Sequence, residues 1–165
     1  MRINPFLLVV PLLITGCGIK KALQKDPLYQ RALVYTQRGQ LSSSLETKAL
    51  IDGVYLNPLY PGKFEKPTFL IGVYNDFDNN LTNPEFNITL NNQPPLEINS
   101  TIPPFVLYKN FPFYNTWMNY YLVKFPDTKF PYKLVYASKD WGSVVLTWNK
   151  PTGCFYVKEP EKDSK

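Results

Sequence analysis

Short runs in which apolar and polar residues alternate are the feature that most limits how this chain can fold. In 86–91 and again in 143–149, apolar residues occupy every second position. A period of two places these side chains on one face of a β-strand, which is expected to face the core. The residues expected to point inward are Phe86, Ile88, Leu90, Val144, Leu146 and Trp148. No comparable stretch has the 3.6-residue apolar period of a long helix, so the chain is predicted to fold from strands.

Further strands are predicted by runs that are rich in β-branched and aromatic residues. These runs are 32–38, 49–56, 68–75, 120–125, 132–138 and 154–158. Turn-forming residues separate them, since 57–67 contains three prolines and a glycine and 139–142 is expected to be a hairpin turn. About eight short strands with no helices between them are typical of an antiparallel sandwich. We therefore predict an all-β, immunoglobulin-like sandwich of about seven to nine strands, with a small barrel as the second alternative.

Catalytic residues are scarce in this sequence. It contains no histidine, which excludes Ser–His and Cys–His catalytic pairs and most catalytic zinc sites. It also has no phosphate-binding glycine loop, dinucleotide-binding motif or nucleophile elbow. Two carboxylates can hydrolyse a glycosidic bond, but 13 acidic residues form many pairs and spacing selects none of them. We therefore expect a protein that is not an enzyme and that has no cofactor.

The first 17 residues have the layout of a secretory signal. The cation Arg2 precedes an apolar run at 6–14, which is shorter than the ~20 residues that span a bilayer. Leu13-Ile-Thr-Gly-Cys17 resembles the lipobox of bacterial lipoproteins. That resemblance implies cleavage after Gly16, a diacylglycerol on the sulfur of Cys17 and acylation of the new amino group, with palmitate as the expected chain. Two or three chains give lasting attachment, since one chain binds only marginally. The alternative is an ordinary secretory signal with a chance cysteine.

The lipobox resemblance, the boundary expected at Pro27 and the strand pattern together predict how the chain is divided. Residues 1–16 are expected to be the signal peptide, 17–27 the lipidated cysteine and a tether, 28–158 the β-sandwich domain, and 159–165 a charged tail. The mature chain has 165 minus 16, or 149, residues, which is enough for one domain. Gly18 stands where the inner-membrane retention signal of some bacteria has Asp, which favours the outer membrane.

The mature chain has few features that indicate a partner. Loss of Arg2 lowers the net charge from +5 to +4, a mild excess that suits an anionic membrane surface or acidic glycans. Nucleic acid is not expected as a partner in the cell envelope, and the charges are spread along the chain, which favours a solvated surface over a binding patch. With Cys17 lipidated, Cys154 is expected to pack as a small hydrophobe, and no disulfide is predicted. Segments 32–39 and 48–58 resemble small bacterial envelope lipoproteins with an immunoglobulin-like domain, and that resemblance implies no activity.

Residues 76–80, Asp-Phe-Asp-Asn-Asn, begin like a calcium-binding loop, because their oxygen-bearing side chains occupy alternate positions. The rest of the motif is missing. Leu81 stands in place of the required glycine, and Asn87 in place of the bidentate Glu. We therefore predict a polar loop between strands and no metal site.

The densest aromatic stretch of the chain runs from Phe105 to Tyr121. One interpretation is a connection that folds under one end of the sandwich and fills its core. The other is an exposed platform for a sugar ring, a lipid or a partner protein. The residues expected to form such a surface are Phe111, Tyr114, Trp117 and Tyr120.

Three Asn-x-Ser/Thr triplets all carry an acidic residue two positions before the asparagine. The asparagines are Asn80, Asn87 and Asn99, and the acids are Asp78, Glu85 and Glu97. Acids make up 13 of 165 residues, so chance seldom produces three such coincidences. The pattern resembles the acceptor site of bacterial oligosaccharyltransferases, which implies N-glycosylation. Asn80 and Asn99 are expected in loops, and Asn87 on the outward face of a strand. The alternative is that all three are polar turn and edge residues.

These observations predict a non-catalytic, lipid-anchored protein of the bacterial cell envelope, which holds or recruits another protein. The alternative is a glycan- or lipid-binding module that uses the aromatic stretch Phe105–Tyr121. The expected partners are therefore the membrane, through the lipid on Cys17, and an envelope protein or glycan whose identity the sequence does not indicate.

Overall fold

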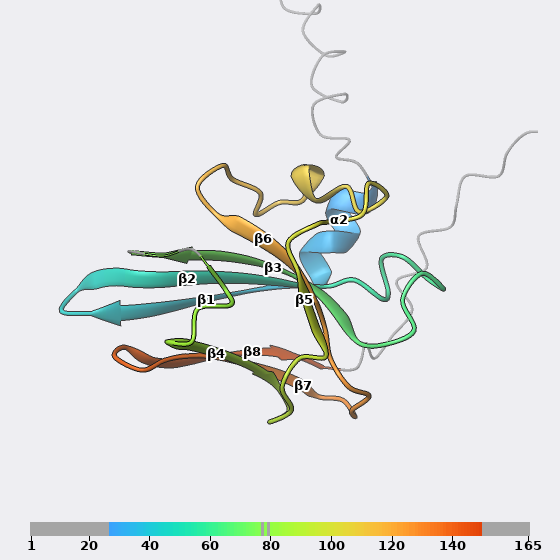
Figure 1. Ribbon diagram of the computed structural model, residues 1–165. Coiled ribbons are helices and arrows are strands. Elements are labelled where there is room, and N and C mark those ends of the chain that lie inside the picture. The colour runs from blue at the N-terminus through green and yellow to red at the C-terminus, as the bar shows by residue number, and fades with distance from the viewer. Residues whose placement is uncertain (1–26, 77, 79, 150–165) are drawn as a thin grey trace, which may run out of the picture.

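The computed structural model describes residues 27–76, 78 and 80–149. Within these residues, eight strands form two antiparallel sheets that pack face to face (Figure 1). This arrangement confirms the predicted all-β sandwich, and its two sheets are separately hydrogen-bonded rather than closed into a small barrel. The strand predicted at 154–158 lies outside the described residues.

The larger sheet has five strands in the order β1-β2-β3-β6-β5, and the smaller sheet has three in the order β4-β7-β8. The larger sheet contains β1 (Thr36–Ser43), β2 (Glu46–Tyr55), β3 (Thr68–Asn75), β5 (Glu97–Asn99) and β6 (Asn119–Lys124). The smaller sheet contains β4 (Phe86–Leu90), β7 (Tyr132–Ser138) and β8 (Gly142–Trp148).

The strands that the sequence indicates most clearly are confirmed. β3 and β7 have the bounds predicted for 68–75 and 132–138. Of the six residues predicted to point inward from β4 and β8, five are buried, and the sixth, Val144, packs partly buried against the same core. The predicted hairpin turn joins β7 to β8 and ends at Gly142, whose φ of 81° is a conformation that glycine adopts without steric cost.

The strand predicted at 32–38 is wrong at its start, because the helix α2 (Pro27–Val34) forms there. The residues that pack one side of this segment on the protein are Leu28, Ala32 and Tyr35. Their spacing is helical, but eight residues are too few for a period of 3.6 to stand out in the sequence. The strand begins after the helix, at Thr36, whose hydroxyl donates a hydrogen bond to the carbonyl oxygen of Ala32 at 2.6 Å.

β1 then continues to Ser43, beyond the predicted end of the strand at Arg38. A two-residue turn at Ser44 and Leu45 connects it to β2, and both residues have positive φ angles, 51° and 68°. Such turns match the twist of paired strands, but they usually contain asparagine or glycine. The sequence therefore lacked the signal that would have revealed this hairpin.

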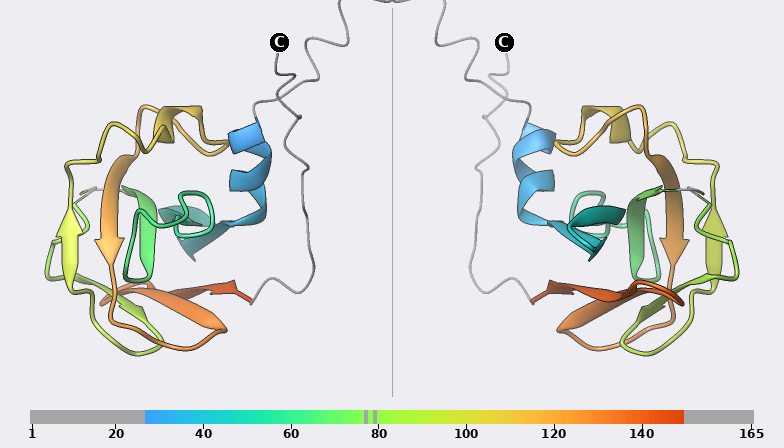
Figure 2. Two further views of the ribbon diagram at one scale, coloured as in Figure 1. Left: turned by 90° about the vertical axis from the view of Figure 1, so that its right-hand side faces the viewer. Right: turned by 90° about the vertical axis from the view of Figure 1, so that its left-hand side faces the viewer.

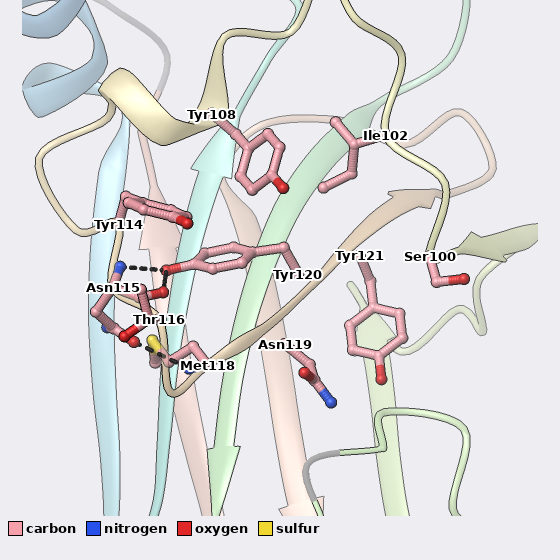
Figure 3. A pocket seen from close by; sticks show the side chains of 10 residues that line it. All are labelled: Ser100, Ile102, Tyr108, Tyr114, Asn115, Thr116, Met118, Asn119, Tyr120 and Tyr121. Carbon is pink, nitrogen blue, oxygen red and sulfur yellow. Dashed lines mark hydrogen bonds between the residues drawn. The ribbon is translucent and has the colours of Figure 1, made fainter.

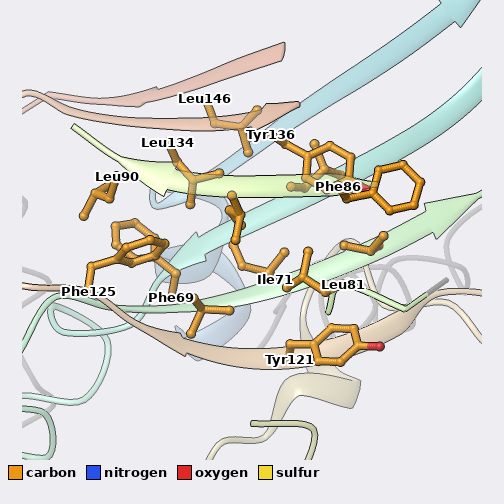
Figure 4. Close-up of a cluster of buried hydrophobic side chains, with 14 of the residues drawn as sticks. Phe69, Ile71, Leu81, Phe86, Leu90, Tyr121, Phe125, Leu134, Tyr136 and Leu146 are labelled. Atoms are coloured by element: carbon orange, nitrogen blue, oxygen red, sulfur yellow. The ribbon is translucent and has the colours of Figure 1, made fainter. Parts of the chain in front are cut away.

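The main hydrophobic core lies between the two sheets (Figure 4). Its largest fully buried side chains include Phe69, Phe125 and Tyr136. The hydroxyl of Tyr136 donates a hydrogen bond to Oδ1 of Asn75 at 2.9 Å, so this polar group is satisfied within the core. Burial raises the pKa of Tyr136 well above its ordinary value, which keeps the phenol protonated.

A second hydrophobic cluster covers the other face of the five-stranded sheet. Its buried residues come from α2, from the sheet and from the irregular segments that follow β2 and β5. Figures 1 and 2 show α2 and the segment around 102–118 lying over this outer face, opposite the small sheet. Because the large sheet is covered on both faces, seven of the eight residues of β3 are buried. The aromatic stretch at 105–121 belongs largely to the segment that covers this outer face.

Candidate functional site

The aromatic stretch at 105–121 is divided between the core and the surface. Phe111 is only 3% exposed and packs beside Phe113 in the outer cluster. The prediction that Phe111 belongs to an exposed binding surface is therefore wrong, because its ring fills the space between the sheet and its cover. The interpretation of this stretch as core is correct for these two residues.

The other three residues of the predicted surface remain accessible. Trp117 is 56% exposed, and its ring meets Tyr74 edge-on with 5.7 Å between ring centroids. Tyr114 and Tyr120 are half-buried, and so is Tyr108 beside them. Part of the stretch therefore presents aromatic rings to solvent, as the second interpretation requires.

A hollow of about 550 Å³ lies beside these tyrosines, and we call it the tyrosine hollow. It is lined by residues of 100–102 and 114–121 together with Tyr108 (Figure 3). The ring centroid of Tyr108 is 5.7 Å from that of Tyr114 and 5.3 Å from that of Tyr120. Tyr114 and Tyr120 are stacked at 5.5 Å with 26° between their planes. These are favourable aromatic geometries, so the three rings form one wall with a defined shape.

Tyr120 is held by the sheet below it and by the segment above it. On β6 it is paired in register with Gly72 of β3, and a Cβ on that glycine would lie 2.8 Å from Cε1 of the Tyr120 ring. The ring can therefore lie across the sheet only because residue 72 has no side chain. Its hydroxyl accepts a hydrogen bond from the backbone N–H of Asn115 at 2.8 Å, and burial raises the pKa of Tyr120.

Asn115 organises the turn that carries Trp117. Its side-chain oxygen accepts hydrogen bonds from the backbone N–H groups of Trp117, at 3.2 Å, and of Met118, at 2.9 Å. Asparagine often stabilises turns in this way, by bonding the backbone two or three residues ahead. The turn therefore presents Trp117 in a fixed place beside the tyrosine wall.

A smaller hollow of about 240 Å³ is lined by Arg38, Leu50, Asp52 and residues of 112–118, and we call it the arginine hollow. The Asp52 side chain is fully buried, at 0% exposure, whereas that of Arg38 is 63% exposed. Nε of Arg38 donates to Oδ1 of Asp52 at 2.6 Å, and Nη2 donates to Oδ2 at 2.9 Å. This two-point contact raises the pKa of Arg38 and fixes the plane of its guanidinium.

One row of residues across the large sheet underlies this region. Arg38, Asp52, Gly72 and Tyr120 are neighbours in register on β1, β2, β3 and β6. Sequence reasoning missed the ion pair in this row. The available signal was an acidic residue in the middle of the apolar run 49–56, since a carboxylate in a buried strand needs a partner.

The three candidate glycosylation sites lie in different surroundings. Asn80 is exposed in the connection between β3 and β4, where its side-chain oxygen accepts hydrogen bonds from the backbone N–H and the hydroxyl of Thr82. Asn87 is exposed on the edge strand β4, pointing away from the core as predicted. Asn99 is half-buried and is the last residue of the strand β5, so its placement in a loop is corrected. A three-residue strand is too short to show alternation in the sequence.

The acidic segment 76–80 lies between β3 and β4, as a polar connection. Asp76 pairs with Lys48 at 3.0 Å. Asp78 accepts hydrogen bonds from the backbone N–H of Asn80 at 2.9 Å and from the side chain of Asn83 at 2.8 Å. Across the described part of the chain, no three acidic or cysteine side chains are gathered in a way that could hold a metal ion. Cys17 and Cys154 lie outside it.

Comparisons with protein-family models, with curated proteins and with solved structures give no match. Of the residues that the structure describes, none belongs to a helix with the length and apolar character needed to cross a membrane. The described residues form a β-sandwich with two neighbouring hollows, lined by aromatic and polar residues, at the outer face of its larger sheet.

Proposed function

We propose that this protein is a non-catalytic, lipid-anchored binding module of the bacterial cell envelope, and that the tyrosine hollow is its binding site. The observation that carries the proposal is the wall formed by Tyr108, Tyr114 and Tyr120. These rings pack on one another and still line a hollow of about 550 Å³.

The wall has the properties of a recognition surface. Tyrosine offers a large apolar face and a polar tip, and it loses little conformational entropy on binding because it has few rotatable bonds. The packing of the three rings and the bond between Tyr120 and Asn115 set the shape of the wall before any ligand arrives. Preorganisation of this kind lowers the cost of binding. The hollow can accommodate a side chain of a partner protein, a sugar ring of a glycan or a lipid headgroup.

The anchor is proposed from the lipobox at Leu13–Cys17. Nine residues lie between Cys17 and Pro27, where the described domain begins, and the extended chain from Cys17 to Pro27 reaches about 35 Å. The domain would thus remain close to the membrane, with the outer membrane as the favoured location. Replacing Cys17 with Ser removes the sulfur that accepts the lipid. The variant should lose processing and membrane attachment, and fractionation with labelled fatty acid tests this directly.

Binding at the tyrosine hollow is tested by comparing Tyr114→Ala with the matched variant Phe105→Ala. Both truncate a partly exposed aromatic residue, but Phe105 packs with Tyr60 and Phe64 and does not line either hollow. Wild-type protein and the Phe105 variant should capture the same partner from detergent-solubilised envelope, or give the same ligand-induced shift in tryptophan emission. The Tyr114 variant should do neither. Equal behaviour of the two variants would contradict the assignment.

We also propose that Asn80 is the preferred glycosylation site of the three, in a host that has the transferase. Its exposure in a connection supports this order, because the enzyme must draw the asparagine into an unpaired conformation. Asn87 and Asn99 are each paired in a strand, which makes them poorer acceptors.

A further inference from the structure

We infer that the ligand of this module is an uncharged glycan that contacts both the tyrosine hollow and the arginine hollow. The inference rests on the proposed function, since it names the chemical class of ligand for the same site. It is carried by three features: the position of the two hollows, the balance of charge in their linings, and the hydrogen-bonding groups beside Trp117.

The two hollows are neighbours on one face of the protein. Tyr114, Asn115 and Met118 line both of them, so both adjoin the turn that Asn115 organises. A compact ligand fills one hollow, whereas a ligand built from several linked rings can contact both. An oligosaccharide has this form, and its rings carry apolar C–H faces that pack on aromatic side chains.

The linings carry no net charge. The tyrosine hollow is lined by tyrosines, Asn, Ser, Thr and apolar residues, with no Asp, Glu, Lys or Arg. The arginine hollow contains one cation and one anion, Arg38 and Asp52, held together at 2.6 Å. The carboxylate compensates the guanidinium at close range, so an acidic ligand would gain little electrostatic attraction and would have to shed its hydration. The lining therefore favours a ligand that is polar but uncharged.

Arg38 is arranged to bind a neutral oxygen. A guanidinium has five N–H groups, and the contact with Asp52 uses two of them. Because Asp52 lies buried beneath and the Arg38 side chain is 63% exposed, the guanidinium is held in one plane at the surface of the hollow. Hydroxyl and ether oxygens of a sugar are acceptors that suit such a donor.

Trp117 supplies the adjacent stacking surface. It is exposed, its backbone is held by Asn115, and Tyr74 supports its ring from the edge. A sugar ring on Trp117 would lie next to both the Arg38 donor and the wall that includes Tyr114. Aromatic anchors of this type typically carry a large share of binding energy.

The test uses calorimetric titration of the mature protein with neutral hexose and N-acetylhexosamine oligosaccharides, and with uronic acid oligosaccharides as their acidic counterparts. The neutral ligands should bind with similar affinity at low and high ionic strength, because salt screens charged ligands only. Trp117→Ala should weaken binding at least about fivefold, the loss that defines an important contact residue. Phe105→Ala is the matched aromatic control and should bind as wild type does.

Arg38 is tested with the paired variant Arg38→Met/Asp52→Leu, which removes the donor without leaving a buried carboxylate unpaired. It should also bind neutral glycans less tightly. Circular dichroism confirms that each variant is folded. Stronger and salt-dependent binding of the acidic oligosaccharides would overturn the inference. So would a failure of all oligosaccharides to bind while the wild type captures a protein partner through Tyr114, in which case the proposed function survives. If the wild type binds no oligosaccharide and captures no protein partner, both the glycan inference and the proposed function are refuted.

Discussion

Removing Arg38 alone should destabilise the protein more than its exposed position suggests. In Arg38→Met, the fully buried carboxylate of Asp52 loses both of the hydrogen bonds that Arg38 donates to it. Breaking a buried ion pair by deleting one partner costs about 3 to 5 kcal/mol. The Arg38 side chain is 63% exposed, so water reaches the carboxylate in the variant, and we expect a loss at the lower end, about 3 kcal/mol. The melting temperature should fall by about 10 °C.

The paired variant Arg38→Met/Asp52→Leu separates this cause from loss of packing. Replacing both charges with apolar groups removes the unpaired carboxylate, so its stability should lie within about 1 kcal/mol of wild type. Urea unfolding followed by circular dichroism at neutral pH measures both variants, and an unchanged slope shows that the same surface is exposed on unfolding. An Arg38→Met variant whose free energy of unfolding lies within about 0.5 kcal/mol of wild type would refute the unpaired Asp52 carboxylate as a source of instability. A paired variant as unstable as the single one would refute it as well.

Three other outcomes are expected. Gly72→Ala places a Cβ 2.8 Å from the Tyr120 ring, so it should cost about 1 to 3 kcal/mol and also weaken binding at the tyrosine hollow; wild-type ligand affinity in this variant would argue against that hollow as the site. Burial raises the pKa values of Tyr120 and Tyr136, so at high pH the folded state retains protons that the unfolded state releases. The stability of the folded state should therefore be unaffected by these two groups below about pH 10 and should decline above it, with tyrosinate absorbance rising as the protein unfolds. Intact-mass spectrometry from a glycosylating host should find Asn80 modified in wild type and unmodified in Asp78→Ala, whereas a bare Asn80 in wild type would exclude the site.

The ion pair between Arg38 and Asp52 explains how the mostly apolar strand β2 can contain a buried acid. Asp52 lies between Ile51 and Gly53 in β2, and its side chain points to the outer face, where Arg38 of β1 reaches it. An ion pair of this kind contributes little net stability compared with apolar residues of similar size. The binding site proposed above would give this ion pair a role that its small contribution to net stability does not.

The sequence by itself determined the strands of the inner core. Residues 86–91 and 143–149 indicated β4 and β8 because a period of two is a local property that places apolar side chains on one face wherever the strand is used. Residues 68–75 and 132–138 indicated β3 and β7 because they are rich in β-branched and aromatic residues, which is also a local property. The turn before Gly142 was equally local, since it needs only a residue that tolerates a positive φ. The absence of histidine likewise excluded whole classes of catalysis without any structure.

The tertiary structure alone decided which residues of the outer face of the large sheet are buried and which are exposed. Aromatic residues at 105–121 look alike in sequence, yet Phe111 is buried and Trp117 exposed, because burial depends on which segments fold over the sheet. Likewise, α2 is a helix because its apolar side packs into the hydrophobic cluster on the outer face of the large sheet. Arg38 and Asp52 meet because β1 and β2 pair in one register. Contacts between residues distant in the chain follow from strand order and register, which local patterns do not specify.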